Sequence, residues 1–239
     1  MNKQLILWAL CLLLHYSASA KAMPLFEVRG NIPGIDSGTI ELLRIRANDY
    51  YNGFQIKKIT VPLRSGKFQF NGSIEYPHIF YAKVSTKESV KIIDLFFIDR
   101  GVQVLDINFK AQMAYNELPL QGSLTNTEYN AVYKPLMKYT DSVLNVFSME
   151  GQTLYQKYGS QPPENEKKKV RLLMEIYRNS LDSVIYPYIK KYPSSYVGLW
   201  RLVERFSVRG YTPLFDSAVR MLNANLKKTS VGQFLIISI

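Results

Sequence analysis

The side chains that most often carry out catalysis are scarce in this chain of 239 residues. It contains one cysteine, Cys11, and two histidines, His15 and His78. A thiol nucleophile, a disulfide, a Cys/His metal site and a histidine-based triad all depend on these residue types. Outside the N-terminal region, chemistry is therefore left to carboxylates, lysines, tyrosines and His78.

The N-terminal region has the pattern of a cleavable export signal. Lys3 supplies a positive charge, Leu5 to Leu14 form an apolar run, and Ala18-Ser19-Ala20 offers the small side chains that signal peptidase accepts. The run is about half the length needed to cross a bilayer. We expect the signal, residues 1–20, to be cleaved near Ala20 and the mature protein to be exported to the periplasm, outer membrane or cell surface. Lipidation of Cys11 is the weaker alternative, because Leu10 rather than a small residue precedes it.

Three aspartates and His78 are the remaining candidates for catalysis. Asp94, Asp99 and Asp106 could act as paired carboxylates in glycoside hydrolysis only if two of them faced one cleft. The turn at Asp99 explains that residue better, and a lone histidine does not make a metal site. We therefore predict no catalytic, cofactor-binding or metal-binding residues, and a protein that is not an enzyme.

A pair of tyrosines is the one candidate for ligand contact. Tyr50 and Tyr51 stand beside Asn52-Gly53, a pattern typical of a hairpin turn. Aromatic rings at a hairpin tip can stack on a sugar or a peptide. The alternative, in which both rings fold back onto the sheet, is the favoured interpretation of the sequence.

Composition limits the class of protein and its partners. The chain carries a formal net charge of +11, with 47% hydrophobic and 13% aromatic residues, which excludes a disordered chain and allows a real core. The second half is the more basic, with 16 basic and 9 acidic residues after Gly122. It could make a weak contact with an anionic surface, although we favour a solvated helical face as the explanation of the charge. Because the protein is expected to be exported, we favour an envelope protein or a peptide as partner and no nucleic acid. The pattern does not indicate an oligomeric state.

Period-two alternation before Gly122 predicts a β-rich domain over residues 24–122. In Lys58 to Arg64 alternate residues are apolar, and after the Ser65-Gly66 turn Phe68 and Phe70 continue the pattern, so we expect these two rings to be buried together. The run Ile92 to Ile98 is apolar on both faces apart from one aspartate, which favours a central strand. Short strands at such spacing are typical of an antiparallel β-sandwich or a partial barrel.

Over residues 123–239 the apolar residues recur with the 3.6-residue period of an α-helix. The sequence therefore predicts an α+β protein, in which an antiparallel β-sandwich-like domain is followed by an α-helical region. Helix starts are predicted at the capping box Thr125 to Glu128, at Pro162-Pro163, at Ser194 or Ser195, and at Thr212-Pro213. In the second helix, we expect three apolar residues to line a seam with other helices, namely Tyr177, Leu181 and Tyr188.

Several short motifs resemble a known family, the domain of unknown function 4369. They are Gly66 to Gly72 with Pro77 and Tyr81, Phe96 to Gly101, Leu120 to Ser123 with Asn126, Glu128 and Tyr129, Lys191 to Ser195, and Thr229 to Gln233. The resemblance implies the N-terminal part of an exported thioredoxin-like thiol-disulfide oxidoreductase of Bacteroidota.

The sequence departs from that family at the point where catalysis would occur. It has no Trp-Cys-x-x-Cys motif and ends at Ile239, about where the thioredoxin-like module would begin. Without a thiolate there is no thiol-disulfide exchange. Two hypotheses follow: a non-catalytic exported accessory or binding module, or a truncated or separate component of an oxidoreductase. The apolar end Phe234 to Ile239 is compatible with truncation or with a C-terminal strand.

Overall fold

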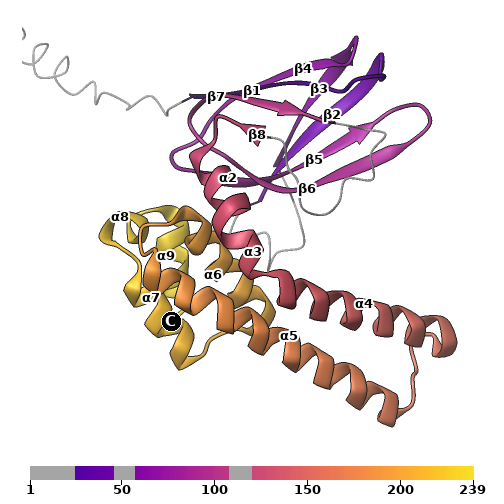
Figure 1. The fold of residues 1–239 in the computed structure, drawn as a ribbon, viewed down its shortest axis with the longest axis vertical. Coiled ribbons are helices and arrows are strands. Elements are labelled where there is room, and N and C mark those ends of the chain that lie inside the picture. The colour runs from indigo at the N-terminus through magenta and orange to yellow at the C-terminus, as the bar shows by residue number, and fades with distance from the viewer. Residues whose placement is uncertain (1–24, 46–56, 108–119) are drawn as a thin grey trace, which may run out of the picture.

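The computed structural model describes residues 25–45, 57–107 and 120–239. In this part of the chain, one curled β-sheet built from the N-terminal half precedes a helical C-terminal half (Figure 1). The predicted α+β class is therefore confirmed. Tyr50, Tyr51, Cys11 and the expected export signal all lie outside the described residues.

The sheet has eight strands in the order β6-β5-β2-β3-β4-β1-β7-β8, and every neighbouring pair is antiparallel except β1 and β7. It curls into a half-barrel, the partial-barrel alternative for a sandwich-like domain. The strands are β1 (Leu25–Asn31), β2 (Ser37–Arg44), β3 (Lys57–Arg64), β4 (Lys67–Ser73), β5 (His78–Ser85), β6 (Val90–Ile98), β7 (Gly101–Asp106) and β8 (Leu120–Gln121).

Alternate residues of these strands fill the inside of the curl. Phe68 and Phe70 are both buried, and their ring centroids lie 5.7 Å apart in an edge-to-face arrangement, so the expectation for this pair is confirmed. Phe26 packs on Phe80 from the opposite side, with 5.9 Å between centroids. Ser65 and Gly66, both at positive φ, make the tight turn that brings β4 back along β3.

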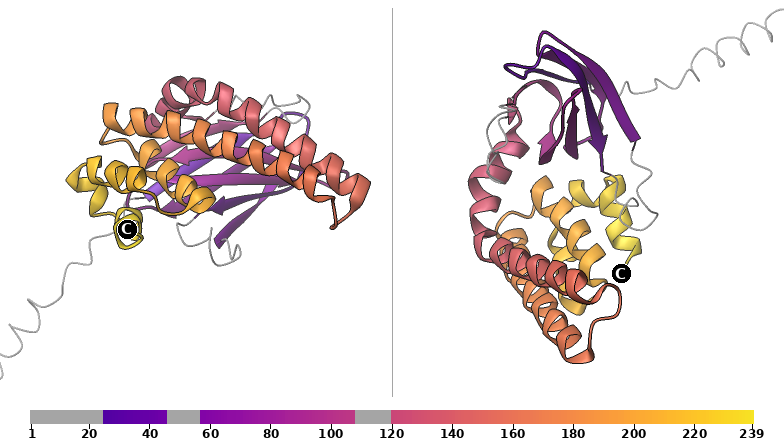
Figure 2. Two further views of the ribbon diagram at one scale, coloured as in Figure 1. Left: turned by 90° about the horizontal axis from the view of Figure 1, so that it is seen from below. Right: turned by 90° about the vertical axis from the view of Figure 1, so that its right-hand side faces the viewer.

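The helical half packs against one side of the sheet, and two of its helices form a projecting hairpin (Figures 1 and 2). Tyr177, Leu181 and Tyr188 are buried in its core, as expected of the second helix. The elements are α2 (Leu124–Glu128), the π-helix η2 (Tyr129–Tyr133), α3 (Lys134–Leu136), the hairpin helices α4 (Lys138–Tyr158) and α5 (Glu164–Lys191), α6 (Tyr196–Arg209), α7 (Pro213–Met221), α8 (Ala224–Lys227) and α9 (Ser230–Ile237).

Local capping rules place most helix starts correctly. α5 begins directly after Pro163, while Ser195 and Thr212 cap α6 and α7 through their side-chain oxygens. The predicted capping box at Thr125 is wrong, because the hydroxyl of Ser123 caps α2 by accepting the amide of Asn126 at 2.9 Å. The cap therefore lies two residues earlier than expected.

Two further expectations about elements need correction. Most of the apolar end Phe234 to Ile239 belongs to α9 rather than to a strand, because Thr229 caps a helix whose apolar side chain Leu235 is buried. The run Ile92 to Ile98 lies in β6, which is an edge strand of the sheet and not a central one. Both of its faces are apolar because one faces the inside of the curl and the other faces the helices.

Truncation of Phe70 to alanine tests the packing inside the curl. Phe70 is fully buried, so we expect a loss of about 3–5 kcal/mol in the free energy of unfolding. The control is Leu172→Ala on α5, where the side chain is 62% exposed and the loss should stay within about 0.5 kcal/mol. Denaturant titration measures both, and equal losses for the two variants would contradict the placement of Phe70.

Candidate functional site

The helical half is attached to the sheet at the edge strand β6. The backbone N–H of Phe97 donates a hydrogen bond to Oδ1 of Asn126 on α2, with a donor–acceptor distance of 3.1 Å. The backbone N–H of Thr125 in turn donates to Oδ2 of Asp99 at 3.0 Å, directly after β6. The carboxylate of Asp99 thus stabilises the first turn of α2, where the helix dipole is positive, and the two bonds fix α2 across one end of the edge strand.

Aromatic packing forms a second attachment, centred on His78. This ring stacks on Tyr76, with 5.1 Å between centroids, and lies 4.8 Å from the ring of Trp200 on α6. The indole N–H of Trp200 donates to the carbonyl oxygen of Pro77 at 3.1 Å. Burial lowers the pKa of His78 from 6.5 to about 3, and the charge of Arg44 lowers it further in the same direction. His78 is therefore a neutral packing residue at neutral pH.

Beside these attachments, the sheet and helices enclose a cavity of about 700 Å³, which we call the joint cavity. Tyr81 of β5 and Leu95 of β6 line it from the sheet. Helical residues complete it, namely Tyr129, Asn130, Lys134, Pro135, Met137, Lys138, Asp141, Ser142, Leu144, Asn145, Tyr177, Arg201 and Glu204. The residues on α4, such as Lys138 and Asn145, are exposed, so this wall of the cavity faces solvent.

Two local irregularities shape the joint cavity. Between Phe80 and Ala82, one residue of β5 opposes two of β6, a β-bulge that turns Leu95 towards the helices. Opposite it, the chain widens into the π-helix η2, in which the N–H of Lys134 bonds the carbonyl oxygen of Tyr129. Pro135 explains the widening, because it has no N–H to give and its ring would clash with an α-helical carbonyl four residues earlier.

Arg201 is the main charge at the floor of the joint cavity. Its side chain is buried, donates to the hydroxyl of Tyr129 at 2.6 Å and forms an ion pair with Glu204. Its guanidinium carbon lies 4.9 Å from the ring centroid of Tyr129 and 5.2 Å from that of Tyr133. Burial alone would lower the pKa of Arg201, but the charge of Glu204 and the tyrosines around the guanidinium together outweigh it and raise the pKa well above its ordinary value, so Arg201 stays charged at any physiological pH.

The groups that line the joint cavity are suited to hydrogen bonding and aromatic contact. Burial raises the pKa of Tyr177 to about 12, so its phenol stays protonated and serves as a hydrogen-bonding group rather than as a base. Among the described residues, no group of three or more His, Cys, Asp or Glu side chains could hold a metal ion. The joint cavity therefore offers aromatic faces, hydroxyl and amide groups, and charges of both signs.

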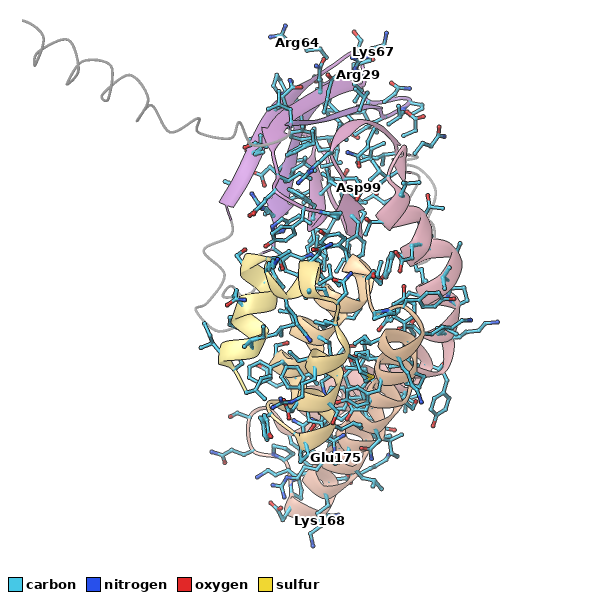
Figure 3. The ribbon with its side chains drawn as sticks, turned by 90° about the vertical axis from the view of Figure 1, so that its left-hand side faces the viewer. Arg29, Arg64, Lys67, Asp99, Lys168 and Glu175 are labelled. Atoms are coloured by element: carbon cyan, nitrogen blue, oxygen red, sulfur yellow. The ribbon has the colours of Figure 1, made fainter. Side chains whose placement is uncertain are left out.

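The aspartates that the sequence singled out do not meet in one cleft. Asp99 lies at the foot of the sheet, where the helical half begins, and serves α2 (Figure 3). Asp106 is exposed, and it lines a separate open concavity of about 680 Å³ together with Arg29, Arg64 and Lys67. Those three basic residues stand at the far end of the sheet (Figure 3). The side chain of Asp94 lies outside what the structure describes.

Sequence reasoning did not predict the joint cavity, and of its lining residues only Tyr177 was expected to be buried between helices. Tyr81 and Tyr129 had been noticed only as parts of family-like motifs, and Arg201 had not been noticed at all. A usable signal was present: Arg201 interrupts the apolar face of α6 between Trp200 and Leu202, where every neighbour is buried. A cation in such a position needs partners, which a search for catalytic motifs does not reveal.

Comparison with known proteins adds no relative: no family model, curated protein or solved structure matches this chain. Within the described residues, no helix has both the length and the apolar character required to cross a membrane.

The burial of His78 predicts a dependence of stability on pH. The pKa is 6.5 in the unfolded chain and about 3 in the folded one, so the unfolded state binds the extra proton between these values. Stability should fall as the pH falls through this window, by about 2 kcal/mol between pH 7 and pH 5. Urea titrations at the two pH values measure the loss, and His78→Phe should abolish it. An unchanged loss in that variant would show that another group is responsible.

Proposed function

We propose that this chain is a non-catalytic binding module of the cell envelope, which holds a peptide segment of a partner protein in the joint cavity. The observation that carries the proposal is the joint cavity itself, because its volume of about 700 Å³ lies in the range typical of ligand sites. Its position between two halves of the fold supports the same conclusion, since binding sites are common at such boundaries.

The lining favours a peptide over a small apolar or a highly charged ligand. Apolar contacts come from Leu95, Met137 and Leu144, while Asn130 and Asn145 carry amides that match a peptide backbone. Tyrosine rings provide rigid contact area with a polar end, which is why they are enriched where proteins bind one another. A peptide supplies backbone polar groups and side chains of both kinds.

The alternative functions have less support in the structure. An oxidoreductase component needs a thiol, and the chain's one cysteine, Cys11, lies in the expected export signal. A contact with an anionic surface would use the basic hairpin, but Lys169 pairs with Glu150 and Arg171 with Glu164, which reduces the local positive field. We therefore expect no reduction of insulin disulfides by the purified protein and only weak binding to anionic vesicles.

Selection from a random peptide library on the immobilised mature protein tests the proposal. We expect enriched peptides, and we expect Asn145→Trp on the exposed wall to weaken their binding by at least about tenfold, or about 1.4 kcal/mol, by filling the joint cavity. The matched control is Val146→Trp, the next residue on α4, which is 48% exposed and does not line the cavity.

Fluorescence anisotropy with a labelled peptide gives the affinities. Circular dichroism confirms that both tryptophan variants are folded. The absence of enriched peptides, or equal binding by the two variants, would contradict the proposal.

A further inference from the structure

We infer that the far end of the sheet carries a second ligand site, which binds the carboxylate groups of an acidic saccharide. The site is the open concavity of about 680 Å³ that Arg29, Arg64 and Lys67 line, which we call the basic concavity. It lies at the end of the sheet remote from the helices (Figure 3), so the inference goes beyond the proposed function of the joint cavity.

The hairpin between β3 and β4 places two cations side by side. Ser65 and Gly66 both have positive φ, and this two-residue turn sets Arg64 directly opposite Lys67. Side chains that lie directly opposite each other point to the same face, with their Cβ atoms about 5 Å apart, and like charges in such a pair repel. Both residues are exposed, and within the described part of the chain neither side chain has a hydrogen bond or an ion pair. An anion bound between them would relieve the repulsion.

The two strands separate directly after this pair, and the basic concavity lies where they do. β3 is eight residues long and β4 seven, yet Arg64 and Lys67 are the one pair that joins them in the ladder. Beyond it, Pro62 of β3 and Gln69 of β4 line the opening from either side. The volume of the basic concavity lies in the range typical of ligand sites.

The acidic residue on the described lining leaves the two cations unneutralised. Lys67 lies opposite Asn31 of β1, which in turn lies opposite Asp106 of β7. Two strand spacings, roughly 10 Å, therefore separate Asp106 from Lys67 across the sheet, too far for an ion pair. Arg29 already has a partner in Glu27. The unpaired positive charge of the site therefore comes from the hairpin.

The other groups on the lining favour a saccharide over a simple anion. The planar guanidinium of Arg64 can donate two parallel hydrogen bonds to a carboxylate. Asn31 and Gln69 carry amides that can pair with hydroxyl groups, while Pro62 and Val104 offer apolar surface to the C–H face of a sugar ring. An acidic saccharide presents all three kinds of group along one chain, and an open site allows that chain to continue on either side.

The test measures binding of an oligogalacturonide, a short chain of uronic acid sugars, to the purified protein by calorimetry. Its methyl ester of equal length is the ligand control, because it keeps the hydroxyls and ring faces but carries no carboxylate charge. Arg64→Ala and Lys67→Ala each remove one cation of the pair. The matched control variant is Lys168→Ala, which removes an exposed lysine near the tip of the α4–α5 hairpin (Figure 3).

We expect the acid to bind at least about tenfold more tightly than the ester, and each of the two hairpin variants to weaken its binding by about tenfold. Lys168→Ala should change the affinity by less than about twofold. Arg64→Lys should keep part of the affinity, because it retains the charge but loses the planar fork. Equal binding of acid and ester, or equal losses in Lys67→Ala and Lys168→Ala, would overturn the site.

Urea unfolding separates a binding role from a structural one. Because the two cations repel each other, Lys67→Ala should unfold at the same urea concentration as the unmodified protein or at a higher one. A lower midpoint would overturn the account of two opposed charges.

Two further measurements test the ligand class and the independence of the site. A polyglutamate peptide should bind more weakly than the oligogalacturonide, and equal or tighter binding would overturn the choice of a saccharide. Asn145→Trp, which fills the joint cavity, should leave saccharide binding unchanged. A loss in that variant would contradict the separation of the two sites.

Discussion

One buried hydrogen bond, from the backbone amide of Phe97 to the side chain of Asn126, fixes the helical half against the sheet. It satisfies an outward-facing amide of an edge strand, which would otherwise be costly to bury. The bond from Thr125 to Asp99 and the stack of His78 with Trp200 hold the same boundary from either side. These contacts place α2 across one end of β6, and the joint cavity lies beside them, between Leu95 of that strand and the helices.

The irregular features of the chain gather around this space. The bulge in β6 directs Leu95 to the helical side, and the π-helix before Pro135 moves Tyr129 and Tyr133 around the buried cation of Arg201. Bulges and π-helices are frequent at functional sites, because each changes the direction of a side chain at a small cost to the regular element. Their coincidence at one cavity supports recognition as the role of the joint.

The sequence was sufficient to predict the fold at the level of local patterns. Period-two alternation placed Phe68 and Phe70 inside the sheet, and capping rules found α6 and α7. It was not sufficient where tertiary contacts decide the outcome. The run in β6 is apolar on both faces, and this pattern predicts a central strand. An edge strand has the same pattern when helices cover one of its faces and the sheet's own core covers the other, so the sequence placed β6 wrongly. The site escaped prediction because Tyr81 and Arg201 come from distant elements and share no motif spacing.

Amide hydrogen–deuterium exchange on the mature protein, with and without a library-selected peptide, tests the central claim most directly. The claim is that the joint cavity, which Leu95 of β6 and residues of α4 line, is a peptide site. It predicts slower exchange in Val90–Ile98 on peptide binding, together with slower exchange at the start of α4. Protection confined to the far end of the sheet, around Arg29, Arg64 and Lys67, or to the tip of the α4–α5 hairpin would contradict it.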